Sequence, residues 1–344
     1  MRGNTSQMSV GVEAANAVPR VTLRQHIAAA GCMLALCALE ASAQPAFPSK
    51  PVRLVVGFVP GGGADTAARL AAQKLFESWG QQVVVDNRAG AGGNTAAEIV
   101  AKSAPDGYTL LLSSPGPVAI NPAMRVKLAF DPQKDFAPIT QVAFGPNLLA
   151  VPVALKAGSV KELIALAASS PGKLSYGSSG MGSTPMLSAE LFRMMAKVEL
   201  LGVSYKGAAP AVIDLVAGRL DILMMSIPSI LPQVRAQRLR ALAITSLKRS
   251  PLLPDVPTLH ESGLAGYEAG VWWGMLAPAG VPRELVARIN SAVVRGLRAP
   301  EVVSRLAAEG VDIAATSPEE FAVFLRDETA KWSRVVKAAG IKAE

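Results

Sequence analysis

Two glycine-rich loops are the segments of this 344-residue chain best suited to bind a small anion. The first covers residues 58–66 (Phe-Val-Pro-Gly-Gly-Gly-Ala-Asp-Thr) and the second covers residues 177–185, with four hydroxyl groups. Glycine lets a backbone approach a ligand closely, and the free N–H groups at a helix start attract negative charge. For the first loop, a tight turn capped by Asp65 or Thr66 explains the residues equally well. For the second, a flexible linker is disfavoured by the strand and helix patterns that flank it.

Two shorter segments add candidate contacts, one after the predicted strand that ends at Ser113 and one after Ser204. A lysine at position 206 could pair with a carboxylate, although a solvated surface lysine is the commoner outcome. The full set of candidate ligand-binding residues is Pro60, Gly61, Gly62, Gly63, Asp65, Thr66, Ser114, Ser178, Ser179, Gly180, Gly182, Ser183, Thr184, Tyr205 and Lys206.

Signatures of catalysis are weak in this sequence. The first loop lacks the Gly-Lys-Ser/Thr of a Walker motif and does not fit Gly-x-Gly-x-x-Gly. His260 is the only histidine after the first 43 residues, and it is not part of a His-Glu-x-x-His zinc motif. The sequence also has no Gly-x-Ser-x-Gly elbow, which would mark a nucleophilic serine. Both cysteines, Cys32 and Cys37, lie within those first residues. We expect no enzyme activity, catalytic residue, metal ligand or cofactor.

The N-terminal segment has the three parts of a secretory signal. Arg20 and Arg24 precede an apolar run over residues 27–39, and the small-x-small pattern of residues 41–43 follows. That run is shorter than the ~20 residues of a membrane span, so an anchor is the weaker interpretation, as is lipidation of Cys32. We expect cleavage after Ala43 and a periplasmic mature chain.

Size and charge restrict the remaining classes. The roughly 300 residues after the signal exceed what one hydrophobic core usually serves, so two domains are expected. The formal net charge is +8, of which about +7 belongs to the mature chain, and its basic residues form no block. This dispersal disfavours nucleic-acid binding and leaves only a mild bias toward anions.

Short β-branched runs alternate with helical patterns along the chain. Strands are expected over residues 52–56, 83–85, 108–113, 174–177, 200–205, 222–225 and 241–245. Helices are expected over residues 65–79, 94–102, 186–196 and 208–217. Such alternation builds parallel, doubly wound α/β sheets.

The order of these elements predicts two α/β domains joined by a hinge. Two strand–helix blocks are separated by an extended stretch over residues 138–152, and the mostly helical part from residue 282 onward is expected to pack back on the first block. Domain 1 then covers residues 46–146 plus 271–344, and domain 2 covers residues 147–270. Two chain crossings, near Gly145 and Gly270, make a hinge beside a cleft. Trp272 and Trp273 either line that cleft or pack in the hinge.

Taken in order, seven motifs resemble those of the substrate-binding proteins of tripartite tricarboxylate transporters, the Bug family. They lie at residues 47–53, 59–65, 85–94, 104–110, 176–184, 205–208 and 255–258. The resemblance implies a type II periplasmic-binding fold and a small organic acid whose carboxylate is held by Gly61 to Thr66 and by Ser178 to Thr184. It also implies contacts near Tyr205 and Lys206, and transmembrane transporter subunits as partners of a monomeric protein.

Two departures from the family pattern affect the expected ligand. Met186 replaces a common histidine, and the segment after Ser113 reads Ser-Pro-Gly-Pro-Val instead of a Gly/Thr/Asn-rich loop. A stiffer and less polar loop suggests an acid with a less polar far end, aromatic or aliphatic. The competing function is a periplasmic sensor that reports ligand occupancy to a membrane signalling partner, and the sequence does not separate the two.

Overall fold

The computed structural model describes residues 47–178, 183–205 and 207–341, so the expected signal segment lies outside it. Contacts divide the chain into a short N-terminal unit, residues 1–49, and a unit from Lys50 to Glu344 that holds all the elements below. Among the helices of the described part, none is long and apolar enough to cross a membrane.

A first group of elements forms a parallel sheet with helical crossovers. Strands β1 (Val52–Val56), β2 (Val83–Asn87) and β3 (Thr109–Ser113) are joined by α2 (Gly63–Trp79) and α3 (Asn94–Ala101). Apart from Arg53, the central strand β1 is apolar and buried, as expected for a parallel strand covered on both faces. These elements agree with the predicted ones to within two residues at each end.

A second group repeats this arrangement. Strands β5 (Ser175–Ser178), β6 (Leu201–Ser204) and β7 (Ile222–Ser226) are parallel, and α6 (Thr184–Ala196) and α7 (Ala208–Val216) connect them. Strand β8 (Leu239–Ile244) was also expected, whereas the sequence reading missed α5 (Val160–Ser169) and α8 (Ile227–Arg235).

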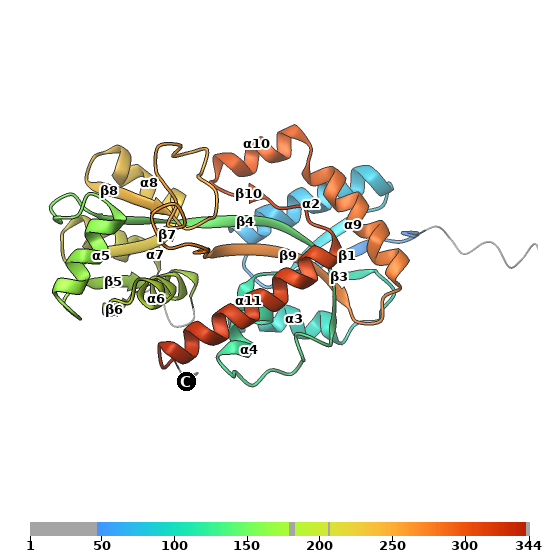
Figure 1. Cartoon of the computed structure of the whole chain (residues 1–344). Coiled ribbons are helices and arrows are strands. Elements are labelled where there is room, and N and C mark those ends of the chain that lie inside the picture. Colours follow the sequence, from blue (N-terminus) through green and yellow to red (C-terminus); the bar gives the residue numbers. More distant parts are fainter. Residues whose placement is uncertain (1–46, 179–182, 206, 342–344) are drawn as a thin grey trace, which may run out of the picture. The chain divides into compact units, whose positions relative to one another are not determined.

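Two long strands run between the groups (Figure 1). Strand β4 (Phe136–Pro152) pairs antiparallel with β9 (Gly270–Pro278) as far as Pro146, and then with β7 and β8. The strand order is β2-β1-β3-β9-β4-β7-β5-β6, so the sheet is mixed and not wholly parallel as expected. The reason is that β4 and β9 pass directly between the groups without a helical crossover, which parallel neighbours require. The domain boundaries at residues 146/147 and 270/271 stay a prediction.

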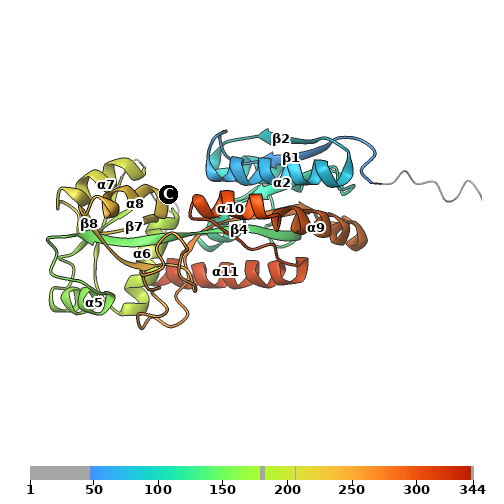
Figure 2. The ribbon, with the colours of Figure 1, turned by 90° about the horizontal axis from the view of Figure 1, so that it is seen from above.

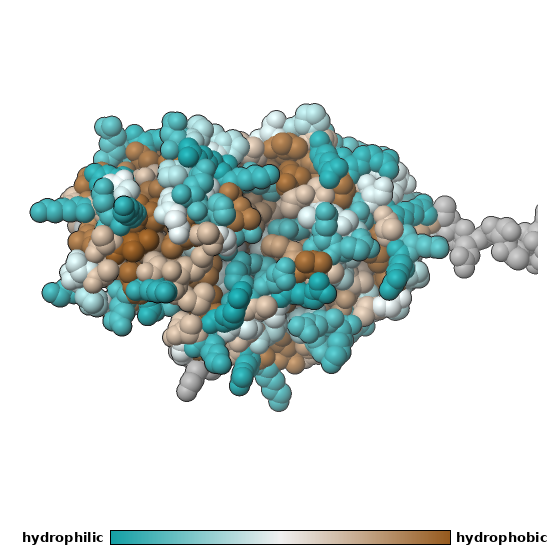
Figure 3. Space-filling view, in the orientation of Figure 1, coloured by the Kyte–Doolittle hydropathy of each residue, from teal (hydrophilic) through white to brown (hydrophobic). Residues whose placement is uncertain are grey.

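The C-terminal part is mostly helical, as expected, and comprises α9 (Arg283–Leu297), α10 (Pro300–Ala308) and α11 (Pro318–Ala338). Helix α9 packs on α2, and α11 packs along β4 (Figure 2). Two features differ from the expectation: the short strand β10 (Asp312–Ile313) pairs with β4, and α11 also contacts α6 of the second group. On the face shown in Figure 3, hydrophilic residues are spread widely, with apolar residues in separate patches between them.

Candidate functional site

The first glycine-rich loop leads into α2 two residues earlier than expected. Gly62 is the N-cap residue, with extended backbone angles and no side-chain cap, so neither Asp65 nor Thr66 caps the helix. The first helical hydrogen bond runs from Thr66 N–H to the Gly62 carbonyl oxygen, 2.9 Å away. The amides of Gly62, Gly63 and Ala64 precede it and have no acceptor within the helix.

Asp65 stabilises the loop from behind. Its buried carboxylate accepts hydrogen bonds from Gly61 N–H (3.0 Å), Arg69 Nε (2.8 Å) and Asn87 Nδ2 (3.1 Å). The same Asn87 amide donates to the Phe58 carbonyl oxygen at 2.9 Å. The Arg69 hydrogen bond, with smaller contributions from Gly61 and Asn87, lowers the pKa of Asp65 to about 2. Asp65 therefore positions the loop and is occupied by protein donors.

The second glycine-rich loop ends at the start of α6. Ser183 is the N-cap residue, and its Oγ accepts a hydrogen bond from Met186 N–H at 3.4 Å. Thr184 and Pro185 form the first helical residues. The predicted contacts Ser179, Gly180 and Gly182, and also Lys206, lie outside the described residues.

A cavity of about 850 Å³ brings the starts of α2 and α6 together. Its polar lining residues are Asn94, Ser114, Asn121, Ser183 and Thr184. Its larger apolar lining residues are Phe58, Val59, Ile120, Met124, Val126, Val271 and Trp273. Gly62 and Gly63 complete the α2 side, and among the lining residues that the structure describes none carries a charge.

The structure of strand β9 shows which of its two tryptophans lines the cavity. Trp273 and Val271 line the cavity, whereas Trp272, between them, is fully buried and donates its indole N–H to Glu328 at 2.9 Å. Alternate residues of a strand face opposite sides, so one tryptophan serves the cleft and the other serves the core. An ideal Cβ on Gly63 would lie 2.8 Å from the Trp273 ring, so the indole rests against the first residue of α2.

The predicted site residues divide into three sets. Gly62, Gly63, Ser114, Ser183 and Thr184 line the cavity. A second set lies outside its lining: Pro60, Gly61, Asp65, Thr66, Ser178 and Tyr205. In this set Tyr205 donates its hydroxyl to Asp214 at 3.0 Å. The third set lies outside the described residues: Ser179, Gly180, Gly182 and Lys206. The ligand-binding roles of all three sets remain predictions.

Sequence reasoning missed a third side of the cavity. Asn94 is the first residue of α3 and follows η1 (Ala91–Gly93); Asn121 begins α4 (Asn121–Ala123) and follows η2 (Gly116–Ile120). Asn121 Nδ2 donates to Asn94 Oδ1 at 2.8 Å. The run Ala-Gly-Ala-Gly-Gly-Asn at residues 89–94 carried a signal for this side, because it also combines glycines with a helix start.

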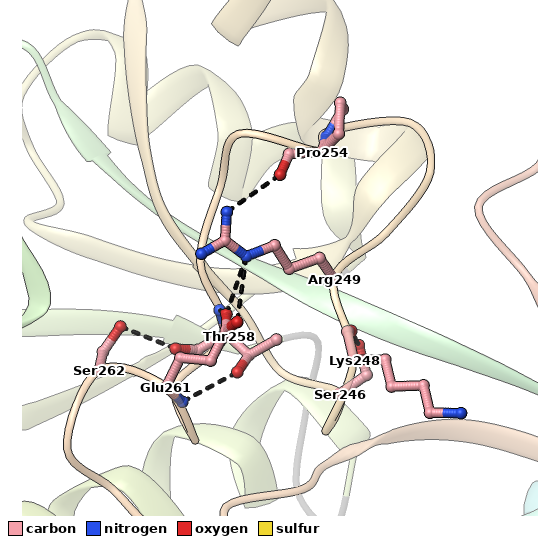
Figure 4. A network of polar contacts seen from close by, with 7 residues as sticks. All are labelled: Ser246, Lys248, Arg249, Pro254, Thr258, Glu261 and Ser262. Carbon is pink, nitrogen blue, oxygen red and sulfur yellow. Dashed lines mark hydrogen bonds and ion pairs between the residues drawn. The ribbon is translucent and has the colours of Figure 1, made fainter.

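The connection between β8 and β9 is not part of the cavity lining, and hydrogen bonds and an ion pair join its own residues to one another (Figure 4). Arg249 Nε contacts both carboxylate oxygens of Glu261, at 3.2 and 3.0 Å, while Thr258 N–H donates to Glu261 at 2.7 Å. His260, also here, accepts a hydrogen bond from Gly266 N–H at 2.8 Å. Within the described residues, no group of three or more His, Cys, Asp or Glu side chains could hold a metal ion.

Comparison with known proteins identifies the family. The model of the tripartite tricarboxylate transporter family receptor matches residues 67–341. The chain belongs to this receptor family. The receptor and the protein BugT of Bordetella pertussis are 35% identical over 297 residues, and this alignment covers 86% of this chain and 91% of BugT. It is thus a Bug-type substrate-binding protein, and the family is one of receptors rather than enzymes.

Two solved structures resemble the receptor along its length. R. palustris Rpa4515 with adipate is 40% identical and covers 86% of this chain and 99% of its own, with a TM-score of 0.71. MatC (Rpa3494) from Rhodopseudomonas palustris with bound malate is 35% identical and covers 84% and 100%, with a TM-score of 0.67. The receptor therefore has the type II periplasmic-binding fold that the motifs implied.

Proposed function

We propose that this receptor captures a small organic carboxylate in the cavity between α2 and α6 and delivers it to the transmembrane subunits of a tripartite transporter. The observation that carries the proposal is the pair of helix starts facing one cavity without a charged side chain in its described lining. The start of α2 provides free N–H groups and the positive end of a helix dipole. The start of α6 adds its dipole and the Thr184 amide, since Pro185 has no N–H and Met186 N–H is bonded to Ser183 Oγ, and together they bind a carboxylate without an arginine. The solved relatives with adipate and malate support this ligand class.

The carboxylate lies at Gly62 and Gly63 on one side and at Ser183 and Thr184 on the other. The first carbons of the acid then lie beside the Trp273 ring, because that ring packs against Gly63. Phe58, Met124 and the other apolar residues receive the body of the acid. This arrangement supports an acid with a largely aliphatic or aromatic body.

The cellular context follows from the family and from the N-terminal segment. We place the receptor in the periplasm after cleavage of its signal behind Ala43, and we take it to be a monomer. Domain 1 (residues 46–146 plus 271–344) and domain 2 (residues 147–270) then close on the ligand. Transfer to the membrane subunits then depends on the closed form, since a partner can distinguish only states that differ in structure.

A single substitution tests the carboxylate site. A Cβ on Gly62 would have only the Val59 carbonyl oxygen within reach, 4.0 Å away, so Gly62→Val fits the fold but fills space at the start of α2. We expect carboxylate affinity, measured by isothermal titration calorimetry after a thermal-shift screen of organic acids, to fall at least about 100-fold, as when a well-placed polar contact is lost.

Gly158→Val is the matched control, because Gly158 is exposed and lies outside the cavity lining. Its affinity should equal that of the wild type. Normal carboxylate binding by Gly62→Val would show that the start of α2 is not the site. A response to neutral compounds alone would keep the fold but reject a carboxylate ligand.

A further inference from the structure

The two asparagines of the cavity form a fixed pair. Asn94 and Asn121 are both partly buried, and the 2.8 Å hydrogen bond between their amides joins the start of α3 to the start of α4. The loops that carry them are tightly packed: a Cβ on Gly93 would lie 3.0 Å from Pro117, and one on Gly116 would lie 3.2 Å from the Gly92 carbonyl oxygen. The pair is therefore pre-organised and has little freedom to rearrange around a ligand.

The pair presents a defined set of hydrogen-bonding groups to the cavity. A primary amide has an NH₂ group and a carbonyl oxygen, and the mutual bond uses one N–H and one oxygen of the pair. Whichever way the two amides are turned, one carbonyl oxygen, one NH₂ group and the second N–H of the donating amide are left, and these atoms have no other hydrogen bond to the part of the chain that the structure describes. The surface offered to a ligand is neutral and combines a donor with an acceptor.

A second carboxylate is a poor match for this surface. An ionised carboxylate only accepts hydrogen bonds, so it would meet the free asparagine oxygen with no proton between them. No charged side chain of the described lining compensates the charge. A primary amide or hydroxyl group both donates and accepts, and satisfies both partners.

On the basis of the proposed function, we infer that Asn94 and Asn121 select acids with one carboxylate and a neutral, hydrogen-bonding group at the far end. The carboxylate occupies the starts of α2 and α6, the body of the acid contacts Trp273, and the asparagine pair binds the far group. These asparagines are specificity-determining residues for the ligand.

The test compares acids that differ only at the far end. The first set is hexanoate, adipate and adipate monoamide; the second, on a benzene ring, is 4-methylbenzoate, terephthalate and terephthalate monoamide. In at least one set, we expect the wild type to bind the monoamide at least about tenfold more tightly than it binds the apolar acid and the diacid of that set. The reason is that a site built to hydrogen-bond a group rejects analogues without it. Affinities are measured by calorimetry.

Variants locate the effect. Asn121→Leu should reduce the advantage of the monoamide to below about threefold while the apolar acid binds at least as well as before, which also shows that the variant is folded. Asn121→Asp should accept the monoamide and reject the diacid further, since it adds a charge of the same sign.

Two results would overturn the inference. One is a diacid that binds most tightly in both sets, and loss of that preference in Lys206→Met would then assign it to Lys206. The other is an apolar acid that binds as tightly as the monoamide. If these six acids and every other carboxylate fail to bind, the proposed carboxylate function itself fails, whereas a preference for diacids overturns only the role of the asparagine pair.

Discussion

At the scale of single residues, Asp65 shows how a charged group serves the site without touching the ligand. It is 4% exposed and holds the Gly61 amide, the Arg69 side chain and the Asn87 amide together. The loop before α2 is thereby held in place through its Gly61 amide. The Arg69 guanidinium, whose Nε lies 2.8 Å from this carboxylate, offsets its negative charge toward an incoming acid.

The lowered pKa of Asp65 makes this contribution dependent on pH. The Arg69 hydrogen bond lowers the pKa of this carboxyl from its ordinary 3.8 to about 2 in the folded chain. Its stabilisation is thus present above pH ~4 and is lost as the pH falls through ~2. We expect Asp65→Asn to be about 2 kcal/mol less stable than the wild type at pH 7, since one pKa unit corresponds to about 1.4 kcal/mol.

Urea unfolding of both proteins between pH 7 and pH 2.5 checks this expectation. The difference in unfolding free energy should shrink steadily below pH ~4, because protonated Asp65 resembles asparagine. Other acidic residues titrate equally in both proteins and cancel in the difference. A difference that stayed constant down to pH 2.5 would show that the charge of Asp65 is not responsible.

At the scale of elements, α11 joins parts of the fold that are distant in sequence. Its buried Glu328 accepts indole N–H bonds from Trp272 of β9, at 2.9 Å, and from Trp332, at 2.8 Å, and pairs with Lys331. Lys331 also donates to the Glu268 carbonyl oxygen at 3.0 Å, just before β9 begins. The helix thus joins the start of β9 to η2 and α4, which it also contacts.

The start of α11 provides a test that separates stability from binding. Ser317 and Glu320 form a capping box: Glu320 N–H donates to Ser317 Oγ at 3.2 Å and Ser317 N–H donates to the Glu320 carboxylate at 2.8 Å. We expect Ser317→Ala to lower the unfolding free energy by about 1 kcal/mol. Ligand affinity should stay unchanged, because Ser317 is not among the residues that line the cavity.

Ser333→Ala on the same helix is the control, since Ser333 is exposed and only donates to the Thr329 carbonyl oxygen. It should change the midpoint of urea unfolding little. Equal destabilisation by both variants would argue against a special role for the cap.

At the scale of the whole molecule, the two crossings are neighbours in the sheet. Pro146 of β4 lies opposite Gly270 of β9, and a Cβ on Gly270 would lie 2.6 Å from the Gly145 carbonyl oxygen. The strands approach each other this closely only because Gly270 has no side chain. A bend at this one place would move the start of α6 relative to that of α2.

If the molecule closes about these crossings, a bound acid should make it more compact. We expect small-angle X-ray scattering to show a smaller radius of gyration at saturating carboxylate than without ligand, because closure gains the contacts of both helix starts. Gly62→Val, which should not bind, gives the matched control and should show no change. Identical scattering of the wild type with and without a ligand that binds by calorimetry would exclude the proposed closure.

The sequence alone determined the local features of this receptor. Apolar periodicity located most strands and helices, the glycine-rich loops marked the starts of α2 and α6, and the order of motifs indicated the family. Each of these signals lies within a few neighbouring residues, where backbone preferences and side-chain spacing act directly. The position of Trp272 and Trp273 near the predicted second crossing also marked both as residues of the cleft or of the hinge.

Only the tertiary structure decided which residues meet. It turned Trp273 and not Trp272 into the cavity, surrounded Asp65 with Arg69, Asn87 and Gly61, and paired Asn94 with Asn121 across 27 residues. It also placed two antiparallel strands in the centre of a sheet expected to be parallel. These contacts depend on strand register and on how closely loops from different elements approach, and no short stretch of sequence contains that information.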